Sequence, residues 1–416
     1  MSKARRMRWS AYALSAALVL ASTVHPGPPA AGADAKGTVR IGLLNATSGP
    51  YEAVGADVNA GFQYFLATHR DELGGFQVQL RTGDEGRSTE SALAVAHQLV
   101  EQDSVDAIVG VDNSDDAYAI ADYLDAQKKP LVITTAGADE LTQDKARHNL
   151  FRVGHTSSQD LMPLGDFACR TLQKRNVAII GVDYSYGWET AGGFARTYTA
   201  AGCRIVQEQY LPRDGDWNTV IDKLDPRANA VFAALGPPDV ERFAAAYRAH
   251  PHPPLLGDSS LANEIFLRDQ RAVTLGVITA SHYVSTIPSA DNDDFKHGYE
   301  TLSGHAVSEF VENGYAAAQA ISSALTRLPA GPVKADALIA QLRGAQFDAP
   351  RGPVRFDTYQ QAVNDVYVRR VVQVGGKYRN TIVTMYPFIT QFWHYDPQKY
   401  LHFPSYAKLK GTWARP

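Results

Sequence analysis

The segment at residues 106–138 limits the folds open to this chain more than any other stretch. It opens with an apolar run at 105–111, as expected of a strand that is buried on both faces of a parallel sheet. After Ser114, apolar residues recur at helical spacing, and a second apolar run covers 131–134. Because parallel strands need a crossover connection, this order of strand, helix and strand predicts a βαβ unit.

Polar side chains stand at the start of the helix in this unit. Asn113 and Ser114 lie where free backbone N–H groups and the positive end of the helix dipole meet. Such a helix end favours an anionic group. The simpler interpretation makes either residue only the N-cap of the helix, and for one isolated loop that interpretation is preferred.

The alternation of strand and helix patterns extends through most of the chain. Further strands are predicted at 38–44, 76–80, 176–182, 203–209, 230–235, 255–256 and 275–280, with helices between most of them. This order predicts an α/β fold with doubly wound parallel sheets, and its repetition after residue 176 predicts two lobes of similar design. Ligands of such sheets bind beyond the carboxyl ends of the strands, so the loops at 45–51, 111–115 and 134–138 should converge.

The first 33 residues have the composition of a cleaved signal peptide. Basic residues come first, an apolar stretch follows at 11–21, and small residues stand at 31–33. The apolar stretch is too short to span a membrane comfortably. We therefore expect secretion to the periplasm and a mature chain that begins at Asp34. Neither cysteine lies near the cleavage site, so we expect no lipid anchor in the membrane.

The charge of the chain limits its partners. The formal net charge is −4, and it becomes −8 without the four basic residues of the first 33. A mature chain this acidic, without a basic stripe, is a poor candidate for binding nucleic acid. The sequence also holds no nucleophile elbow, P-loop or zinc-protease motif. We therefore expect no enzyme activity, no cofactor and no metal.

Several stretches together resemble the branched-chain amino acid binding protein family, the type I periplasmic binding proteins of ABC importers. They are IGLLNATSGPYEAVGADVNAGF, VDAIVGVDNSDDA, PLVITTAGADEL, LFRVGHTSSQD, VAIIGVDYSYGWE and NGYAAAQAI, in this order within residues 38–370. The resemblance implies two Rossmann-like lobes joined by three crossover strands, with the ligand between them. It also implies a monomer that delivers a small-molecule solute to an ABC permease in the inner membrane by hinge closure.

The same resemblance implies domain boundaries. The first lobe would contain 38–154 and 285–351, and the second 155–284 and 352–385, with residues 352–356 as an edge strand. The crossovers would lie near 152–156, 281–286 and 351–352. Residues 386–416 lie beyond the family pattern and are rich in aromatic residues. Because disordered segments are poor in aromatic residues, we expect this segment to pack on the body of the protein.

The resemblance also assigns roles to single residues. Ser114 and the backbone N–H of Ala136 would hold the ligand carboxylate, and Ala138 stands where the family often has a threonine. Tyr186 matches a tyrosine that closes over the ligand, and Pro237 lies in a segment that replaces a second one. The other residues expected at the rim of the site are Asn113, Tyr51 and Tyr184.

The position of the family's acid decides the predicted ligand. Ser259 falls at this position, with Asp258 one residue away. Because a buried ammonium group needs an acceptor, the serine favours an aromatic acid, another non-amino organic acid or an amide over leucine. A shift of one residue would bring in Asp258 and restore a branched-chain amino acid as ligand. A sensor subunit that presents its ligand to a membrane receptor, or a secreted enzyme, is an alternative role.

The only two cysteines, Cys169 and Cys203, both belong to the predicted second lobe. We expect them to form a disulfide, because the periplasm is oxidising. Two buried free thiols are the alternative, since the sequence does not fix the distance between them.

Overall fold

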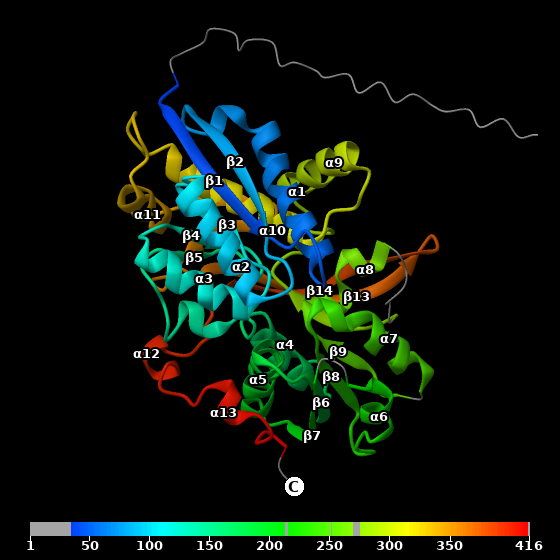
Figure 1. Cartoon of the computed structure of the whole chain (residues 1–416). Helices are drawn as coiled ribbons and strands as arrows, with labels where there is room; N and C mark the ends of the chain where they lie inside the picture. Colours follow the sequence, from blue (N-terminus) through cyan, green and yellow to red (C-terminus); the bar gives the residue numbers. More distant parts are fainter. Residues whose placement is uncertain (1–34, 213–214, 251, 269–274, 415–416) are drawn as a thin grey trace, which may run out of the picture. The chain divides into compact units, whose positions relative to one another are not determined.

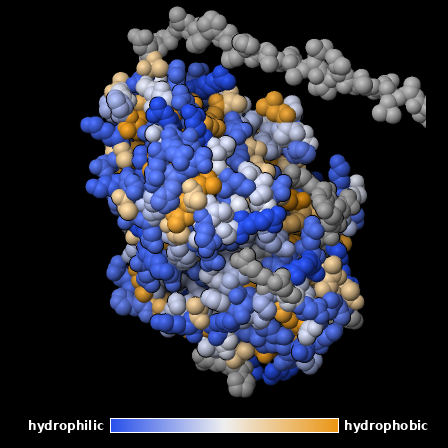
Figure 2. Space-filling model, viewed as in Figure 1, coloured by the Kyte–Doolittle hydropathy of each residue, from blue (hydrophilic) through white to orange (hydrophobic). Residues whose placement is uncertain are grey.

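The computed structural model describes residues 35–212, 215–250, 252–268 and 275–414, which belong to one compact unit (Figure 1). The predicted signal peptide and the cleavage site before Asp34 lie outside the described residues. Within these ranges, no helix is long and apolar enough to cross a membrane. On the face shown in Figure 2, hydrophobic residues are scattered among hydrophilic ones, which is normal for a protein surface.

A five-stranded parallel sheet forms the first lobe. Its order is β2-β1-β3-β4-β5, with β1 (Gly37–Asn45), β2 (Phe76–Asp84), β3 (Ala107–Gly110), β4 (Leu131–Ile133) and β5 (Leu150–Arg152). Successive side chains of a strand point to opposite faces, so Leu43 and Leu44 enter different cores. One core holds α1 (Glu52–Thr68), α9 (Ala290–Ser303), α10 (Glu309–Leu325) and α11 (Ala335–Arg343); the other holds α2 (Thr89–His97) and α3 (Ser114–Ala126).

A mixed sheet forms the second lobe. Its parallel part contains β6 (Asn176–Val182), β7 (Arg204–Leu211), β8 (Ala230–Ala234), β9 (Leu255–Gly257) and β10 (Ile278–Ser281). Antiparallel strands continue it, namely β11 (Gln346–Ala349), β12 (Gly352–Phe356), β13 (Ala362–Val374) and β14 (Lys377–Ile389). The helices α4 (Leu161–Arg170) and α5 (Ser185–Ala200) share one core with this sheet, while α6 (Trp217–Asp222) and α7 (Val240–Ala249) share another; the short α8 (Glu264–Arg268) packs beside β14.

These two lobes confirm the predicted α/β fold, but the end of the second sheet differs from the prediction. Residues 352–356 are not an edge strand, because β11 pairs with β12 on the side away from β13. The long hairpin of β13 and β14 was not predicted at all, and β14 takes in residues 386–389 of the expected C-terminal extension. The expected lobe boundaries stay a prediction, and Val354 and Phe356 of β12 pack in a core of the first lobe.

The C-terminal segment after β14 packs on both lobes, as the sequence predicts, and contains α12 (Pro397–Tyr400) and α13 (Tyr406–Leu409) (Figure 1). The side chain of Gln391 exchanges hydrogen bonds with Thr142 of the first lobe, at 3.0 and 3.1 Å. On the second lobe, the guanidinium of Arg196 in α5 lies over the rings of Tyr400 and Tyr406, 5.2 and 4.8 Å from their centres. The segment therefore bridges the two lobes.

Two further features tie the second lobe together. Cys169 at the end of α4 and Cys203 before β7 form a disulfide. At the edge of the sheet, Ala414 pairs with Ile205 of β7, and the N–H groups of Trp413 and Ala414 donate to Glu208. The C-terminal segment thus covers part of an edge strand, which protects it against pairing with another chain.

Candidate ligand-binding site

A cavity lies between loops of the two lobes, and its empty space of about 520 Å³ includes open solvent at its mouth. Seven of the ten residues predicted for the site line it: Tyr51, Asn113, Ser114, Tyr184, Tyr186, Pro237 and Ser259. The other three, Ala136, Ala138 and Asp258, do not belong to its lining. The carboxyl ends of the strands in both sheets therefore meet at this cavity, as doubly wound sheets require.

At the start of α3, side chains of the protein itself already accept hydrogen bonds from the free backbone N–H groups. The Asn113 side chain caps α3 by accepting the N–H groups of Asp115 and Asp116, at 2.8 and 3.4 Å. Glu85, which follows β2, accepts the N–H groups of Asp112 and Asn113 at 2.8 and 2.9 Å. The place of the anion expected at this loop is thus partly taken by a buried carboxyl group of the chain, which the sequence did not indicate.

Burial raises the pKa of both acids under this loop. The pKa of Glu85 lies well above its ordinary value, first because of burial and then because of the neighbouring Asp112. Burial also raises the pKa of Asp112, which lines the cavity, to about 7. The floor of the cavity at this point therefore carries less negative charge than its two carboxyl groups suggest.

Ser114 remains as a donor from this helix end to the cavity. Its Oγ accepts the N–H of Ala138 at 3.1 Å, so the hydroxyl proton is free to donate elsewhere. The expected role of Ala136 is wrong in this structure. Its N–H donates to the carbonyl oxygen of Val111 at 3.0 Å, and its own carbonyl oxygen accepts from Arg152. The N–H of Ala136 is occupied because the loops after β3 and β4 approach each other, and no local sequence pattern indicates this approach.

Asp258 is likewise unavailable as an acid partner for a ligand. Its carboxylate accepts the N–H groups of Leu235 and Ser260, at 2.6 and 2.8 Å, and it is 1% exposed. Burial raises its pKa to about 7. Asp258 holds the loops after β8 and β9 together. The shift of one residue that would bring its carboxylate to an ammonium group of the ligand therefore does not occur.

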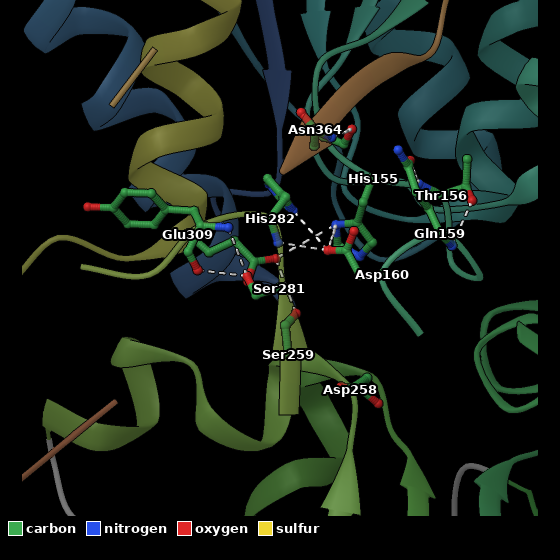
Figure 3. A network of polar contacts seen from close by, with 12 residues as sticks. His155, Thr156, Gln159, Asp160, Asp258, Ser259, Ser281, His282, Glu309 and Asn364 are labelled. Carbon is green, nitrogen blue, oxygen red and sulfur yellow. Dashed lines mark hydrogen bonds and ion pairs between the residues drawn. The ribbon is translucent and has the colours of Figure 1, made fainter. Parts of the chain in front are cut away.

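Beside Ser259, the cavity is lined by an acid that sequence reasoning missed, Glu309. It opens α10, and its Oε1 and Oε2 accept the hydroxyls of Ser259 and Ser281 at 3.1 and 2.7 Å (Figure 3). Arg369, fully buried, lies 3.8 Å from Oε2. The signal in the sequence was weak, because an acid directly after Ser308 is also what an ordinary helix start contains.

His155, Asp160 and His282 lie beside this acid, where the chain passes between the two lobes (Figure 3). Oδ2 of Asp160 is 3.2 Å from Nδ1 of His282 and accepts the backbone N–H of His282 at 2.9 Å. Nε2 of His282 is 2.8 Å from Oδ1 of Asn313. That oxygen also accepts from Arg351, so Nε2 must carry a proton.

This hydrogen-bond pattern fits an imidazolium paired with a carboxylate. Burial alone would lower the pKa of His282, but the hydrogen bond with Asp160 raises it. For Asp160, burial alone would raise the pKa, but His155 and His282 lower it. Ligand atoms of these three residues lie within 4.8 Å of one another, as a metal site would need. Since a protonated His282 offers no lone pair, we describe the group as an ion pair.

Aromatic side chains from both lobes close the cavity. Tyr51 of the first lobe hydrogen-bonds to Tyr184 of the second, and burial raises the pKa of Tyr184 well above its ordinary value. Gly236 makes room for this arrangement, because a Cβ there would lie 2.4 Å from the hydroxyl of Tyr184. Phe310 adds an apolar wall. The cavity thus combines flat apolar surface with hydroxyl donors and can hold a small planar molecule with a polar end.

Known proteins resemble the chain over most of its length. Residues 38–377 match the family model described as "Periplasmic binding protein". The "Leu/Ile/Val-binding protein homolog 6" of Brucella suis biovar 1 is 24% identical over 353 residues, which cover 82% of this chain and 90% of the relative.

Solved structures extend this similarity to the fold. An ABC transporter substrate-binding protein from Sphaerobacter thermophilus aligns with a TM-score of 0.80 and 28% identity, covering 85% of this chain and 99% of its own. A solute binding protein of an ABC transporter from Rhodopseudomonas palustris BisB5, in complex with 3,4-dihydroxy benzoic acid, has a TM-score of 0.80 and 23% identity, with 85% and 98% covered.

Proposed function

Because the chain belongs to the periplasmic binding protein family, we propose that it captures a small carboxylated or amide-type solute, such as an aromatic acid, and delivers it to an ABC importer. Its relatives are substrate-binding proteins of ABC transporters rather than enzymes, and members of the family bind small-molecule solutes and work with ABC permeases. In this proposal the chain is exported by residues 1–33 and acts as a monomer in the periplasm, the compartment of the family.

One observation carries the choice of ligand. Ser114 lies at the N-terminus of α3 with its oxygen already occupied by the N–H of Ala138, so it faces the cavity as a donor. The aromatic side chains of Tyr51 and Tyr184, one from each lobe, line the same cavity. A carboxylate or amide oxygen on Ser114 and a flat ring packed against the tyrosines use both features. The dihydroxybenzoate complex of the Rhodopseudomonas protein shows that this fold accommodates such acids.

Closure of the lobes is the proposed mechanism of capture. A ligand that contacts residues of both lobes favours the closed arrangement, because it binds that state more tightly than the open one. The permease would then recognise the closed state. The hydrogen bond between Tyr51 and Tyr184 and the bond between Ser259 and Glu309 join the lobes in the same way and support this mechanism.

Ligand binding tests the proposal directly. Thermal shifts with benzoate-type acids, amides and dicarboxylates, followed by calorimetry, should identify a carboxylated or amide ligand, since a ligand of the native state raises its stability. Ser114→Ala should weaken the binding of that ligand by about tenfold, the cost of roughly one hydrogen bond to a charged group. The matched control is Ser303→Ala, outside the cavity, which should leave the affinity unchanged. Equal affinities in both variants would contradict the role of Ser114.

Branched-chain amino acids remain the second candidate because Glu309 lines the cavity. Its carboxylate is an acceptor for an ammonium group, although Ser259 and Ser281 already donate to both of its oxygens. Leucine and isocaproate, which is leucine without its ammonium group, separate the two cases by calorimetry. Tighter binding of isocaproate supports a non-amino acid ligand, and tighter binding of leucine supports the amino acid.

A further inference from the structure

We propose that a second cavity, between the lobes and the C-terminal segment, binds a small organic ammonium ion with an aromatic or apolar body. The empty space of this cavity is about 820 Å³, which includes open solvent at its mouth. It is lined by Tyr118 and five residues within 139–145 of the first lobe, by one side of α5, and by residues within 400–407. The family model ends at residue 377, so the segment that walls the cavity lies outside the part shared with the family.

Two buried carboxylates face this cavity, one from each lobe. The N–H of Asp139 donates to Oε2 of Glu189 at 3.1 Å, and the two residues are 3% and 8% exposed. Oδ1 of Asp139 accepts the N–H of Ser158, whereas its Oδ2 has no hydrogen-bond partner among the described residues. Burial raises the pKa of both acids, and for Glu189 the charge of Asp139 raises it further. A buried acceptor without a donor is costly, so a donor that enters the cavity is favoured.

The cations near these acids do not satisfy them. Arg152 is not part of the lining and donates to Gln361, Thr142 and two carbonyl oxygens rather than to either carboxylate, although its charge lowers the pKa of both. Of the charged residues that line the cavity, four are acids (Asp139, Glu140, Asp144 and Glu189) and two are basic (Lys145 and Arg196). Lys145 is paired with Glu140 at 2.7 Å. Burial raises the pKa of Asp139 and Glu189, and a cation beside them would favour their charged forms, so this lining favours a cationic ligand over a neutral or anionic one.

In this cavity, basic side chains of the protein lie over the faces of aromatic rings. The ammonium group of Lys145 lies 4.5 Å from the ring centre of Tyr118. The guanidinium of Arg196 lies 4.7 Å from the ring centre of Phe403 and 4.8 Å from that of Tyr406. Trp188 is a further aromatic residue of the lining. An amine with an aromatic body would therefore find a carboxylate for its charge and rings for the rest of the molecule.

Three probes of similar shape test the charge requirement. Calorimetry at neutral pH should detect binding of 2-phenylethylammonium, little binding of neutral 2-phenylethanol, and no competition at this cavity from 3-phenylpropanoate. The isosteric variants Asp139→Asn and Glu189→Gln should each weaken the ammonium probe by roughly tenfold or more, since each removes a buried charge partner. The matched control is Asp144→Asn, which makes the same change at an exposed acid of the same cavity and should alter the affinity little.

The outcomes separate this site from the cavity of the proposed function. Ser114→Ala should leave the binding of 2-phenylethylammonium unchanged, because Ser114 lines only the first cavity. Both Asp139→Asn and Glu189→Gln are tested, so that a folding defect in one of them does not decide the result. Thermal unfolding shows whether each variant is folded. The proposal is overturned by absence of binding at millimolar probe, by equal binding of the alcohol, or by unchanged affinity in folded Asp139→Asn and Glu189→Gln. A failure of this kind leaves the proposed solute site untouched.

Discussion

Oγ of Ser259 donates to Oε1 of Glu309 at 3.1 Å, and this bond joins the loop after β9 in the second lobe to the first turn of α10. α10 packs in a core of the first lobe, so the bond spans the cleft. Ser259, which stands at the position of the family's acid, thus contacts Glu309, an acid from another part of the chain. The serine and the acid act together as one connection between the lobes at the wall of the solute cavity.

This connection makes Glu309 important for stability. In Glu309→Gln, the amide nitrogen cannot accept one of the two serine hydroxyls, and buried Arg369 loses its nearby charge. We expect the free energy of unfolding to fall by about 3 kcal/mol, the usual cost of removing one partner of a buried charged pair. Urea unfolding measures it. Glu312→Gln, which breaks the pair with Arg351 nearby, serves as the comparison; an unchanged midpoint for Glu309→Gln alone would refute the assignment.

Most of the fold and most of the cavity could be predicted from the sequence. Ser114 was found because it follows a buried strand and opens a helix, and the ends of parallel strands meet at one edge. Tyr186 was found through the family resemblance. Glu309 and Glu85 were not found, because their contacts join positions far apart in the chain and neither belongs to a local pattern. The same limit explains the error at Ala136, whose N–H is claimed by Val111 of a neighbouring loop.

The disulfide between Cys169 and Cys203 should stabilise the second lobe. The cysteines are 34 residues apart, and a loop of this length constrains the unfolded chain by about 3 to 4 kcal/mol in the chain-entropy model. The double variant Cys169→Ala/Cys203→Ala should therefore lose roughly this much stability in denaturant unfolding under non-reducing conditions. Wild-type protein treated with a reductant should match the variant. If the reduced wild-type protein and the variant both unfold at the midpoint of the oxidised protein, the disulfide has no stabilising role.

The C-terminal segment should depend on Gly192. A Cβ at this position would lie 2.0 Å from the ring of Tyr406, so Gly192→Ala should push this buried ring away from α5. We expect limited proteolysis to clip the segment rapidly in the variant and slowly in the wild-type protein. Gly344→Ala is the control, because the atom nearest its added Cβ is 3.9 Å away. Equal cleavage of Gly192→Ala and Gly344→Ala would mean that the packing of Tyr406 does not hold the segment.

The last prediction concerns the ion pair of Asp160 and His282. The groups that face His282 are Asp160, His155, Glu309 and Arg351. Burial and the charge of Arg351 lower the pKa of His282, but the hydrogen bond with Asp160 and the charges of Asp160 and Glu309 outweigh them and raise it above the usual 6.5. A raised pKa of a histidine in the folded state stabilises the protein fully below pH 6.5, and this stabilisation is lost as the pH rises through the folded pKa. The difference in unfolding free energy between the wild-type protein and His282→Gln should therefore shrink as the pH rises above 6.5.

His155 should show the opposite trend and so serves as the internal control. Burial lowers its pKa, so the unfolded chain binds the proton more readily, and the stability contribution of neutral His155 grows as the pH rises toward 6.5. Urea unfolding of wild type, His155→Gln and His282→Gln across the range from mildly acidic to mildly alkaline pH measures both slopes. Slopes of opposite sign in the two variants support a charged His282 beside a neutral His155. Slopes of the same sign would show that the proton on His282 is assigned wrongly, and that Asp160 is not held as the carboxylate of an ion pair.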